Sequence, residues 1–298
     1  MIGFSPLSPL FGVQALDVDL AMPLADAAFK QLEQAFYAHQ VLVLRGQQIT
    51  AAQFAAFARR IGPPQPHVID QFHHPDDPNI LILSNVLQDG QPTGLQDAGS
   101  YFHTDYSYLQ VPARATTLYS RVVPALGGDT LFANQLAAYD DLSQTMKQRI
   151  EPLLGVHHYG NRNNLDETSR TVASVLTDAQ KARMPVITHR IARPHPVTGR
   201  KALYAVSGSA FGILGMPDDE ARDLLDELAT HATQPKYQLS VRYGVGDVVV
   251  WDNAALLHSA TLIDPAHART LWRITLLESS SAAAAPAVLA PSFATPVQ

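Results

Sequence analysis

The sequence contains no cysteine among its 298 residues. This absence excludes disulfide frameworks, thiol nucleophiles and cysteine-bound zinc or iron–sulfur sites, and it leaves His, Asp and Glu as candidate metal ligands. Charge is also scarce, because only 16% of the residues are Asp, Glu, Lys or Arg, and the formal net charge is -6. Without a basic excess, we expect no nucleic-acid partner and no binding to an anionic membrane surface.

Long apolar runs and a basic leader are missing as well. No run approaches the ~18 apolar residues of a membrane span, and Met1 to Pro6 lacks the charged and apolar regions of a secretory signal. We therefore expect a cytoplasmic protein with no membrane partner. With 46% hydrophobic residues the chain can bury a full core, and we interpret residues 1–278 as one domain. The Ala- and Pro-rich residues 279–298 are predicted to form a flexible tail.

Short apolar segments separated by glycine and proline turns run through most of the chain. Helices are predicted only at Leu24–His39, Thr50–Gly62, Leu142–Leu153 and Asp218–His231. Because the strands do not alternate regularly with helices, the pattern favours a mainly β fold with flanking helices, a jelly roll or barrel, over a Rossmann sheet. Residues 161–185 are polar and long for a connection, which predicts a lid-like insertion. Strands are predicted at Val41–Leu44, Asn79–Ser84, Ala115–Val123, Thr130–Ala133, Gly155–Tyr159, Val186–Ile191, Lys201–Val206, Tyr237–Arg242, Asp247–Trp251 and Thr270–Glu278.

An imidazole and a carboxylate lie two positions apart in the aromatic, β-prone run of residues 101–108, Tyr-Phe-His-Thr-Asp-Tyr-Ser-Tyr. On a strand, residues i and i+2 point to the same face, so His103 and Asp105 can reach one point. Neutral imidazole with carboxylate suits Fe, Zn or Mn, and a third ligand must come from elsewhere. His258, which follows an apolar strand and a polar turn, is a candidate for that ligand. Each feature alone is common in proteins that bind no metal.

Further motifs stand at fixed distances from these three residues. Together they resemble the iron(II)- and 2-oxoglutarate-dependent dioxygenases of the taurine and 2,4-dichlorophenoxyacetate dioxygenase family, and the resemblance runs along nearly the whole chain. It implies a double-stranded β-helix (jelly roll, cupin-like), Fe(II), 2-oxoglutarate as cosubstrate and O2. The motifs are Phe102-His103-Thr104-Asp105, Gly127-Gly128-Asp129-Thr130, Ala137-Ala138-Tyr139-Asp140, the turn from His195 to Lys201, Trp251-Asp252-Asn253 with His258, and the pair Arg269 and Arg273.

The resemblance also implies roles for individual residues. His103, Asp105 and His258 would form a two-His-one-carboxylate metal site that leaves three positions of the iron open. The distal carboxylate of 2-oxoglutarate would lie on Arg269 and Thr130, since a planar guanidinium and a hydroxyl donor both suit a carboxylate. The implied reaction is oxidative decarboxylation of 2-oxoglutarate to succinate and CO2, coupled to oxidation, in general hydroxylation, of a substrate C–H bond.

The substrate is expected to be a small anionic molecule. Strand alternation puts Arg269, Leu271 and Arg273 on one face, and two buried cations there would require anionic ligands. The resemblance implies that Arg273 meets the carboxylate or sulfonate of the substrate and that His67 belongs to the substrate pocket. The motifs look closer to the aryloxyacetate branch of the family, which favours a carboxylate over a sulfonate.

Alternatives to these interpretations are compatible with the sequence. A jelly-roll binding protein that lost turnover would bind metal or ligand without forming succinate. A metal-dependent hydrolase with the same three ligands would need a general base near the metal, and the sequence marks no such carboxylate. Arg273 could instead pair with an internal acid, such as Glu278 or Asp247, and only brace its strand. Asp252 and Asn253 are interpreted as residues that shape a turn, with support of the metal ligands as an alternative. The family also allows a homo-oligomer.

Overall fold

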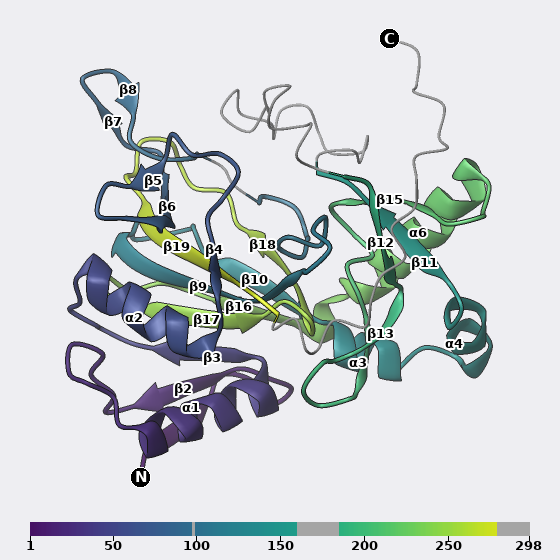
Figure 1. The fold of residues 1–298 in the computed structure, drawn as a ribbon, viewed down its shortest axis with the longest axis horizontal. Helices are drawn as coiled ribbons and strands as arrows, with labels where there is room; N and C mark the ends of the chain where they lie inside the picture. The colour runs from purple at the N-terminus through teal and green to yellow at the C-terminus, as the bar shows by residue number, and fades with distance from the viewer. Residues whose placement is uncertain (97–98, 160–184, 279–298) are drawn as a thin grey trace.

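The described part of the chain, taken from a computed structural model, covers residues 1–96, 99–159 and 185–278. The flexible tail predicted at 279–298 lies outside the described residues, and so does the lid-like insertion predicted at 161–185, apart from Pro185. Strands form the centre of the described residues and helices lie around them (Figure 1). The prediction of a mainly β fold with flanking helices is therefore confirmed.

A nine-stranded sheet forms one wall of the jelly roll, with the strand order β1-β2-β3-β17-β9-β19-β6-β5 and with β4 paired to β19. All of its pairs are antiparallel except β2 with β3. Its strands are β1 (Gly3–Pro6), β2 (Val13–Leu16), β3 (Val41–Leu44), β4 (Pro64–Gln65), β5 (His73–His74), β6 (Asp77–Ser84), β9 (Ala113–Val122), β17 (Val248–Asp252) and β19 (Thr270–Leu277).

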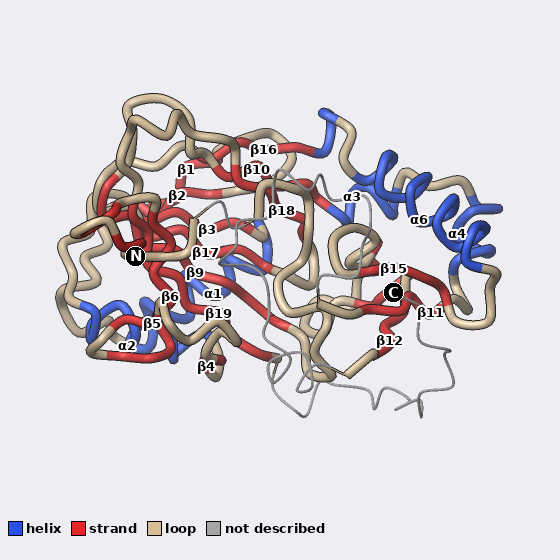
Figure 2. The backbone as a smooth tube through the Cα atoms, turned by 90° about the horizontal axis from the view of Figure 1, so that it is seen from above, coloured by secondary structure: helices blue, strands red, loops and turns tan. Residues whose placement is uncertain are grey.

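Smaller sheets and the helices complete the fold (Figure 2). A three-stranded sheet packs on the inner face of the large one and consists of β16 (Gln238–Val241), β10 (Thr130–Asn134) and β18 (Leu256–Ala260). The other strands are β12 (Ile187–Arg190), β11 (Leu154–His157) and β15 (Ala210–Ile213) in one sheet, β13 (Ala192–Pro194) with β14 (Lys201–Leu203), and β7 (Leu87–Gln88) with β8 (Gln91–Pro92). The helices are α1 (Asp26–His39), α2 (Ala51–Ile61), α3 (Gln135–Asp140), α4 (Gln144–Ile150), α6 (Asp218–Ala232) and the 3-10 turn η3 (Pro235–Tyr237).

The central strands of the large sheet are buried on both faces, which explains their continuous apolar sequences. In β3, Leu42 and Leu44 pack in a core with α1 and α2, whereas Val41 and Val43 pack in the core between the two sheets. This division follows the two-residue period of a strand. Figure 1 shows α1 and α2 beside the large sheet, so the candidate site has to lie on the other, inner face.

The right half of the molecule in Figure 1 is built around α6. Its buried residues Leu224, Leu225 and Leu228 recur at helical spacing and pack against the core that includes Ile213 of β15. The helix predicted at 142–153 is shorter than expected, because Ser143 caps its N-terminus and the chain leaves the helix before Pro152.

No helix among the described residues is long and apolar enough to cross a membrane. Location in the cytoplasm, the absence of a nucleic-acid partner and assembly into a homo-oligomer stay predictions.

The first turn of α2 offers a test of local stability. The Thr50 hydroxyl accepts a hydrogen bond from the Gln53 N–H at 3.3 Å, and the Gln53 carboxamide accepts one from the Thr50 N–H at 2.8 Å. Thr50→Ala removes one half of this capping box, and we expect a loss of about 1 kcal/mol in the free energy of unfolding, measured by urea denaturation. Thr50→Ser keeps the hydroxyl and should stay close to wild type. Equal losses in both variants would contradict the assignment.

Candidate active site

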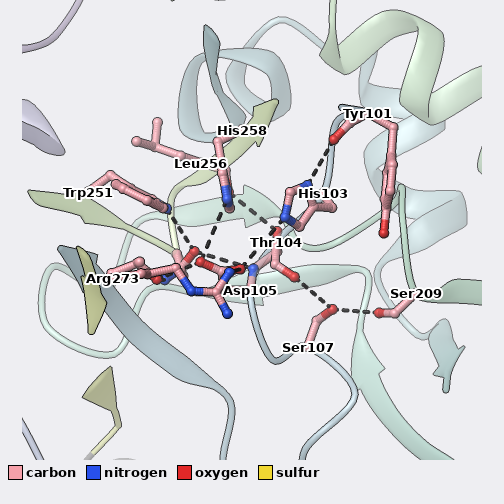
Figure 3. Close-up of polar contacts among 12 residues, drawn as sticks. Tyr101, His103, Thr104, Asp105, Ser107, Ser209, Trp251, Leu256, His258 and Arg273 are labelled. Atoms are coloured by element: carbon pink, nitrogen blue, oxygen red, sulfur yellow. Dashed lines mark hydrogen bonds and ion pairs between the residues drawn. The ribbon is translucent and has the colours of Figure 1, made fainter. Parts of the chain in front are cut away.

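The two candidate histidines lie opposite each other on paired backbone segments (Figure 3). The amide N–H of His103 donates to the carbonyl of His258 at 2.9 Å, and the N–H of His258 donates to the carbonyl of His103 at 2.8 Å. Their ring centroids are 4.1 Å apart. Main-chain pairing between residue 103 and β18 thus brings His258 close to His103 and Asp105.

Residues 101–108 do not form the strand that the sequence predicts. Only His103 makes a bridge, and the chain turns from Asp105 to Tyr108, with Tyr106 at a φ of 50°. This left-handed backbone conformation cannot continue a strand. His103 and Asp105 nevertheless converge as expected, with His103 Nε2 at 3.6 Å from Asp105 Oδ1.

The donor atoms of the three residues face a common point. His103 Nδ1 lies 2.8 Å from the Tyr101 carbonyl oxygen. Because a carbonyl only accepts, Nδ1 carries the proton and Nε2 keeps its lone pair. His258 Nε2 lies 3.6 Å from Asp105 Oδ2, and one ligand atom from each residue falls within 4.8 Å of the others. The predicted trio is therefore assembled in space.

Two glycines leave the space that the His103 side chain occupies. Gly99 and Gly208 have φ values of 78° and 83°, in the left-handed region that favours glycine. A Cβ at Gly99 would lie 2.5 Å from His103 Cε1, and a Cβ at Gly208 would lie 2.7 Å from His103 Cβ. A larger side chain at either position would displace the imidazole. The sequence analysis did not single out these glycines, because nothing adjacent to them in the chain marks the contact.

The charges at this point favour metal binding. Burial alone would raise the pKa of Asp105, but the Arg273 guanidinium, His258 and His103 together hold that pKa well below its ordinary value. Burial, reinforced by His103, lowers the pKa of His258 to about 3. At neutral pH Asp105 is therefore a carboxylate and His258 a neutral imidazole, the forms in which these side chains bind metals.

The donor set fits a divalent iron ion. Two ligands at ~2.1 Å from one ion can lie at most roughly 4.2 Å apart, and both imidazole–carboxylate pairs, at 3.6 Å, satisfy this limit. Two imidazoles with one carboxylate are the ligands of non-haem Fe(II) oxygenases. His103, Asp105 and His258 are thus the residues that would hold Fe(II).

One cavity extends from the histidines to the other predicted cosubstrate residues. His103 and His258 line it together with Thr130, Arg269 and Arg273. Thr130 lies at the start of β10 and Arg269 immediately precedes β19, so the two facing sheets deliver them to one space. The prediction that both arginines share a face is consistent with this position.

Tyr243 contacts both Thr130 and Arg269, although no sequence motif marks it. Its hydroxyl lies 2.8 Å from Thr130 Oγ1, and its ring centroid lies 6.0 Å from the guanidinium carbon of Arg269. Burial raises the pKa of Tyr243 to about 12, so it remains a neutral hydroxyl. An Nη2 N–H of Arg269 also donates to the Gly128 carbonyl at 3.0 Å, which fixes the guanidinium. The hydroxyls of Thr130 and Tyr243 and the guanidinium of Arg269 thus place several hydrogen-bond donors close together, an arrangement that suits a carboxylate.

The alternative partners considered for Arg273 are engaged elsewhere. Glu278 accepts two hydrogen bonds from Arg193, at 2.8 and 2.7 Å, and Asp247 pairs with Arg45 at 2.6 Å. Arg273 is buried, and its Nη1 lies 3.6 Å from Asp105 Oδ1. Arg273 therefore does not pair with Glu278 or Asp247, but it does pair with another internal acid, Asp105, and its guanidinium stands beside this candidate metal ligand (Figure 3).

His67 lies in a neighbouring cavity. That cavity has a volume of about 400 Å³ and is lined by His67 together with Tyr106 and Tyr108, among others. The His67 ring is 5.9 Å from that of Tyr106, and burial lowers the pKa of His67 well below its ordinary value. Tyr106 directly follows Asp105 in the sequence, so His67 lies beside the segment that carries two of the candidate metal ligands. Its role in substrate binding stays a prediction.

A jelly roll whose inner face carries two imidazoles and a carboxylate defines a mononuclear non-haem iron oxygenase. Residues 3–275 match the model of the family described as "Taurine catabolism dioxygenase TauD, TfdA family". The chain belongs to this family, and it is an iron(II)- and 2-oxoglutarate-dependent dioxygenase that consumes O2.

Named relatives agree with this assignment. The chain is 34% identical to the alpha-ketoglutarate-dependent 2,4-dichlorophenoxyacetate dioxygenase of Cupriavidus pinatubonensis, over 93% of this chain and 98% of the relative. It is 32% identical to the (S)-phenoxypropionate/alpha-ketoglutarate-dioxygenase of Sphingobium herbicidovorans, over 90% of this chain and 92% of the relative.

Solved structures are similar as well. AAD-2 in complex with Mn(II) and N-oxalylglycine superimposes with a TM-score of 0.77 at 30% identity, over 94% of this chain and 98% of the other. A taurine dioxygenase from Burkholderia xenovorans gives a TM-score of 0.75 at 28% identity, over 93% and 91% of the two chains. These matches confirm the predicted jelly roll.

Proposed function

We propose that this enzyme hydroxylates a C–H bond of a small organic acid, and that the acid is a carboxylate rather than a sulfonate. The observation that carries the proposal is the position of Arg273, which is buried and lines the same cavity as His103 and His258. A guanidinium removed from water requires an anion. The Asp105 carboxylate, at 3.6 Å, supplies part of this negative charge. A metal ion bound to Asp105 would neutralise the same carboxylate. Arg273 would then be able to bind the anionic group of the substrate.

The residues divide the work along the cavity. His103, Asp105 and His258 would hold the iron, which when bound supplies the oxidation of the C–H bond coupled to decarboxylation of 2-oxoglutarate to succinate and CO2. Thr130 and Arg269, with Tyr243 behind them, would bind the distal carboxylate of 2-oxoglutarate. The contribution of the protein is mainly orientation and exclusion of water, not proton transfer.

Relatives support a carboxylate substrate. The names of the similar enzymes from Cupriavidus pinatubonensis and Sphingobium herbicidovorans refer to dichlorophenoxyacetate and phenoxypropionate, both of which are carboxylates. Another relative, from Pseudomonas putida, is named as a sulfate ester dioxygenase and is 28% identical. The higher identity to the carboxylate enzymes favours a carboxylate here.

The other candidate functions lack support. A hydrolase would need a free general base near the metal, but Asp252, an acid close to His258 in sequence, accepts a hydrogen bond from His195 at 2.7 Å. His195 Nδ1 accepts from the Val197 and Thr198 N–H groups, so its Nε2 carries the proton and Asp252 is committed to it. A binding protein without turnover would have no use for donors arranged for both a metal and a dicarboxylate.

Arg273→Leu tests the proposal. The wild type should release succinate most strongly with a carboxylate from a panel of carboxylates, sulfonates, phosphonates and neutral analogues. Loss of a buried charge-assisted contact costs roughly 2–5 kcal/mol, so the KM for the preferred anion should rise by about 30-fold or more in the variant. Succinate release, measured with and without each compound, gives both quantities.

Two controls make the result specific. Arg121→Leu removes an exposed arginine from β9 outside the cavity and should leave the preference intact. Because Arg273 also neighbours Asp105, anaerobic binding of Fe(II) and 2-oxoglutarate is measured in each variant and should persist. Preference for a neutral analogue, or unchanged anion preference and affinity in Arg273→Leu, would overturn the assignment.

A further inference from the structure

A chain of buried hydrogen bonds reaches the Asp105 carboxylate from the large sheet. The antiparallel register of β9 and β17 places Thr116 opposite Trp251, and Asn253 follows directly after the end of β17. Thr116 is fully buried, and Asn253 is 1% and Asp105 4% exposed. Because all three residues are shielded from bulk solvent, the directions of the hydrogen bonds among them follow from the chemistry of each group.

The direction is set at Trp251. Its indole Nε1 can only donate, and it lies 3.2 Å from Asn253 Oδ1. The Asp105 N–H, which also can only donate, points at the same oxygen at 3.4 Å. The carboxamide of Asn253 is therefore fixed with its oxygen toward Trp251 and Asp105. Its Nδ2 must face the other way, where it donates to Thr116 Oγ1 at 2.9 Å.

The hydroxyl of Thr116 is oriented in turn. Its oxygen accepts from Asn253 Nδ2, so its single proton is left for Asp105 Oδ2, at 2.6 Å. A distance this short is typical of an O–H donor to an ionised carboxylate. Rotation of the Asp105 carboxylate about its Cβ–Cγ bond is thereby stopped. One Oδ2 lone pair is taken by Thr116, and the carboxylate otherwise faces the two imidazoles and the Arg273 guanidinium.

We propose that Thr116, oriented by Asn253, is a positioning residue that holds the Asp105 carboxylate in the orientation that binds the metal. The inference rests on the proposed role of Asp105 as a ligand. If the Asp105 carboxylate were free to rotate, part of the free energy of metal binding would be lost in fixing its orientation. It could also bind the ion through both oxygens and occupy a position that 2-oxoglutarate needs. The hydroxyl of Thr116 prevents both outcomes.

Replacement of Thr116 separates the hydroxyl from the shape of the side chain. Thr116→Val keeps the size and removes the proton donor, whereas Thr116→Ser keeps the donor and removes a methyl group. The measured quantity is the dissociation constant for Co(II) and, under anaerobic conditions, for Fe(II) on the full-length protein. Partners of metal ligands typically contribute 10–100-fold to affinity, so we expect metal binding about 10–100-fold weaker in Thr116→Val and near wild type in Thr116→Ser.

Thr117→Val is the matched control. Thr117 is the next residue on β9, is equally buried, and its hydroxyl has no hydrogen-bond partner within the described chain. It should keep the wild-type metal affinity. Thermal unfolding of the metal-free variants identifies any loss of stability, and the affinities are compared in the folded proteins.

The outcomes are distinct. Wild-type affinity in Thr116→Val, or equal weakening in Thr116→Ser and Thr116→Val, overturns the inference, because the hydroxyl would then not matter. Should Thr116→Val fail to fold, Thr116→Ala takes its place: it also lacks the hydroxyl, it differs from Thr116→Ser only in that group, and equal affinities in these two variants overturn the inference. Asp105→Asn is measured in parallel: if it also binds metal normally, the proposed site itself is wrong, whereas loss of binding there with normal Thr116→Val refutes only the positioning role.

Discussion

His258→Ala should lose iron-dependent turnover almost completely while the protein still folds. Loss of an outer partner costs about 10–100-fold in metal affinity, and loss of a ligand itself should cost more, ~10³-fold or beyond in succinate release with Fe(II) supplied. The remaining donors, His103 and Asp105, would hold the ion through two atoms only. No strand depends on the His258 side chain, because its pairing with His103 runs through the main chain.

The same result is expected for Asp105→Ala, with an added effect on stability. Its removal leaves the buried Arg273 without the carboxylate at 3.6 Å, and an uncompensated buried charge typically costs 3–5 kcal/mol. Asp105→Asn is the gentler variant, since it keeps the shape and removes the charge. Circular dichroism and thermal unfolding establish whether each variant folds.

A second readout separates metal loss from other defects. Anaerobic addition of Fe(II) and 2-oxoglutarate should give the wild type the weak visible charge-transfer band expected of this family, and the band should be absent in His258→Ala. His231→Ala is the control: His231 lies on α6, where its Nε2 N–H donates to the Ala138 carbonyl at 2.8 Å, and the variant should behave as wild type in both assays. Equal turnover in wild type and His258→Ala would refute the metal assignment.

Arg269→Ala should raise the requirement for 2-oxoglutarate. The variant loses a charge-assisted contact of roughly 2–5 kcal/mol, which corresponds to a KM increase of about 30-fold or more. Because this contact is made equally before and during the reaction, kcat at saturating cosubstrate should change much less than KM. The measurement is succinate release as a function of 2-oxoglutarate concentration at saturating iron.

Tyr243→Phe provides a graded version of the same experiment. The Tyr243 hydroxyl contacts the Thr130 hydroxyl, so it acts on the cosubstrate through Thr130. A neutral hydrogen bond contributes about 0.5–1.5 kcal/mol. We therefore expect a KM increase of roughly 2- to 10-fold. Tyr204→Phe is the matched control, because the buried Tyr204 hydroxyl has no hydrogen-bond partner among the described residues. An unchanged KM in Arg269→Ala would move the anchor of 2-oxoglutarate elsewhere.

The scaffold was largely predictable because its signals are local. The apolar run Val41–Leu44 and the capping box at Thr50 depend on neighbours in sequence, and both elements are present as expected. β18 was missed, because Leu256–Ala260 is a strand only through its pairing with distant residues. The predicted strand at residues 101–108 failed for the converse reason: a β-prone composition was overridden by the turn that aims Asp105.

The site was predictable to the extent that motifs mark it. The three candidate ligands and both arginines were identified from sequence, and the structure brings them together. Thr116 and Tyr243 were not, since a threonine in a strand and a tyrosine after one carry no distinguishing neighbour. Their importance arises from hydrogen bonds to residues more than 100 positions away or on other strands. Only the folded chain reveals such partners.

The bridge between His103 and His258 also bears on the order of events in folding. These residues are far apart in sequence, and closing so long a loop is entropically costly and slow. The two imidazoles meet only when the sheets have already assembled around them. We therefore expect iron to bind the folded structure and to stabilise it by mass action, not to nucleate folding. Metal should accordingly slow the unfolding of this enzyme while leaving its rate of folding nearly unchanged.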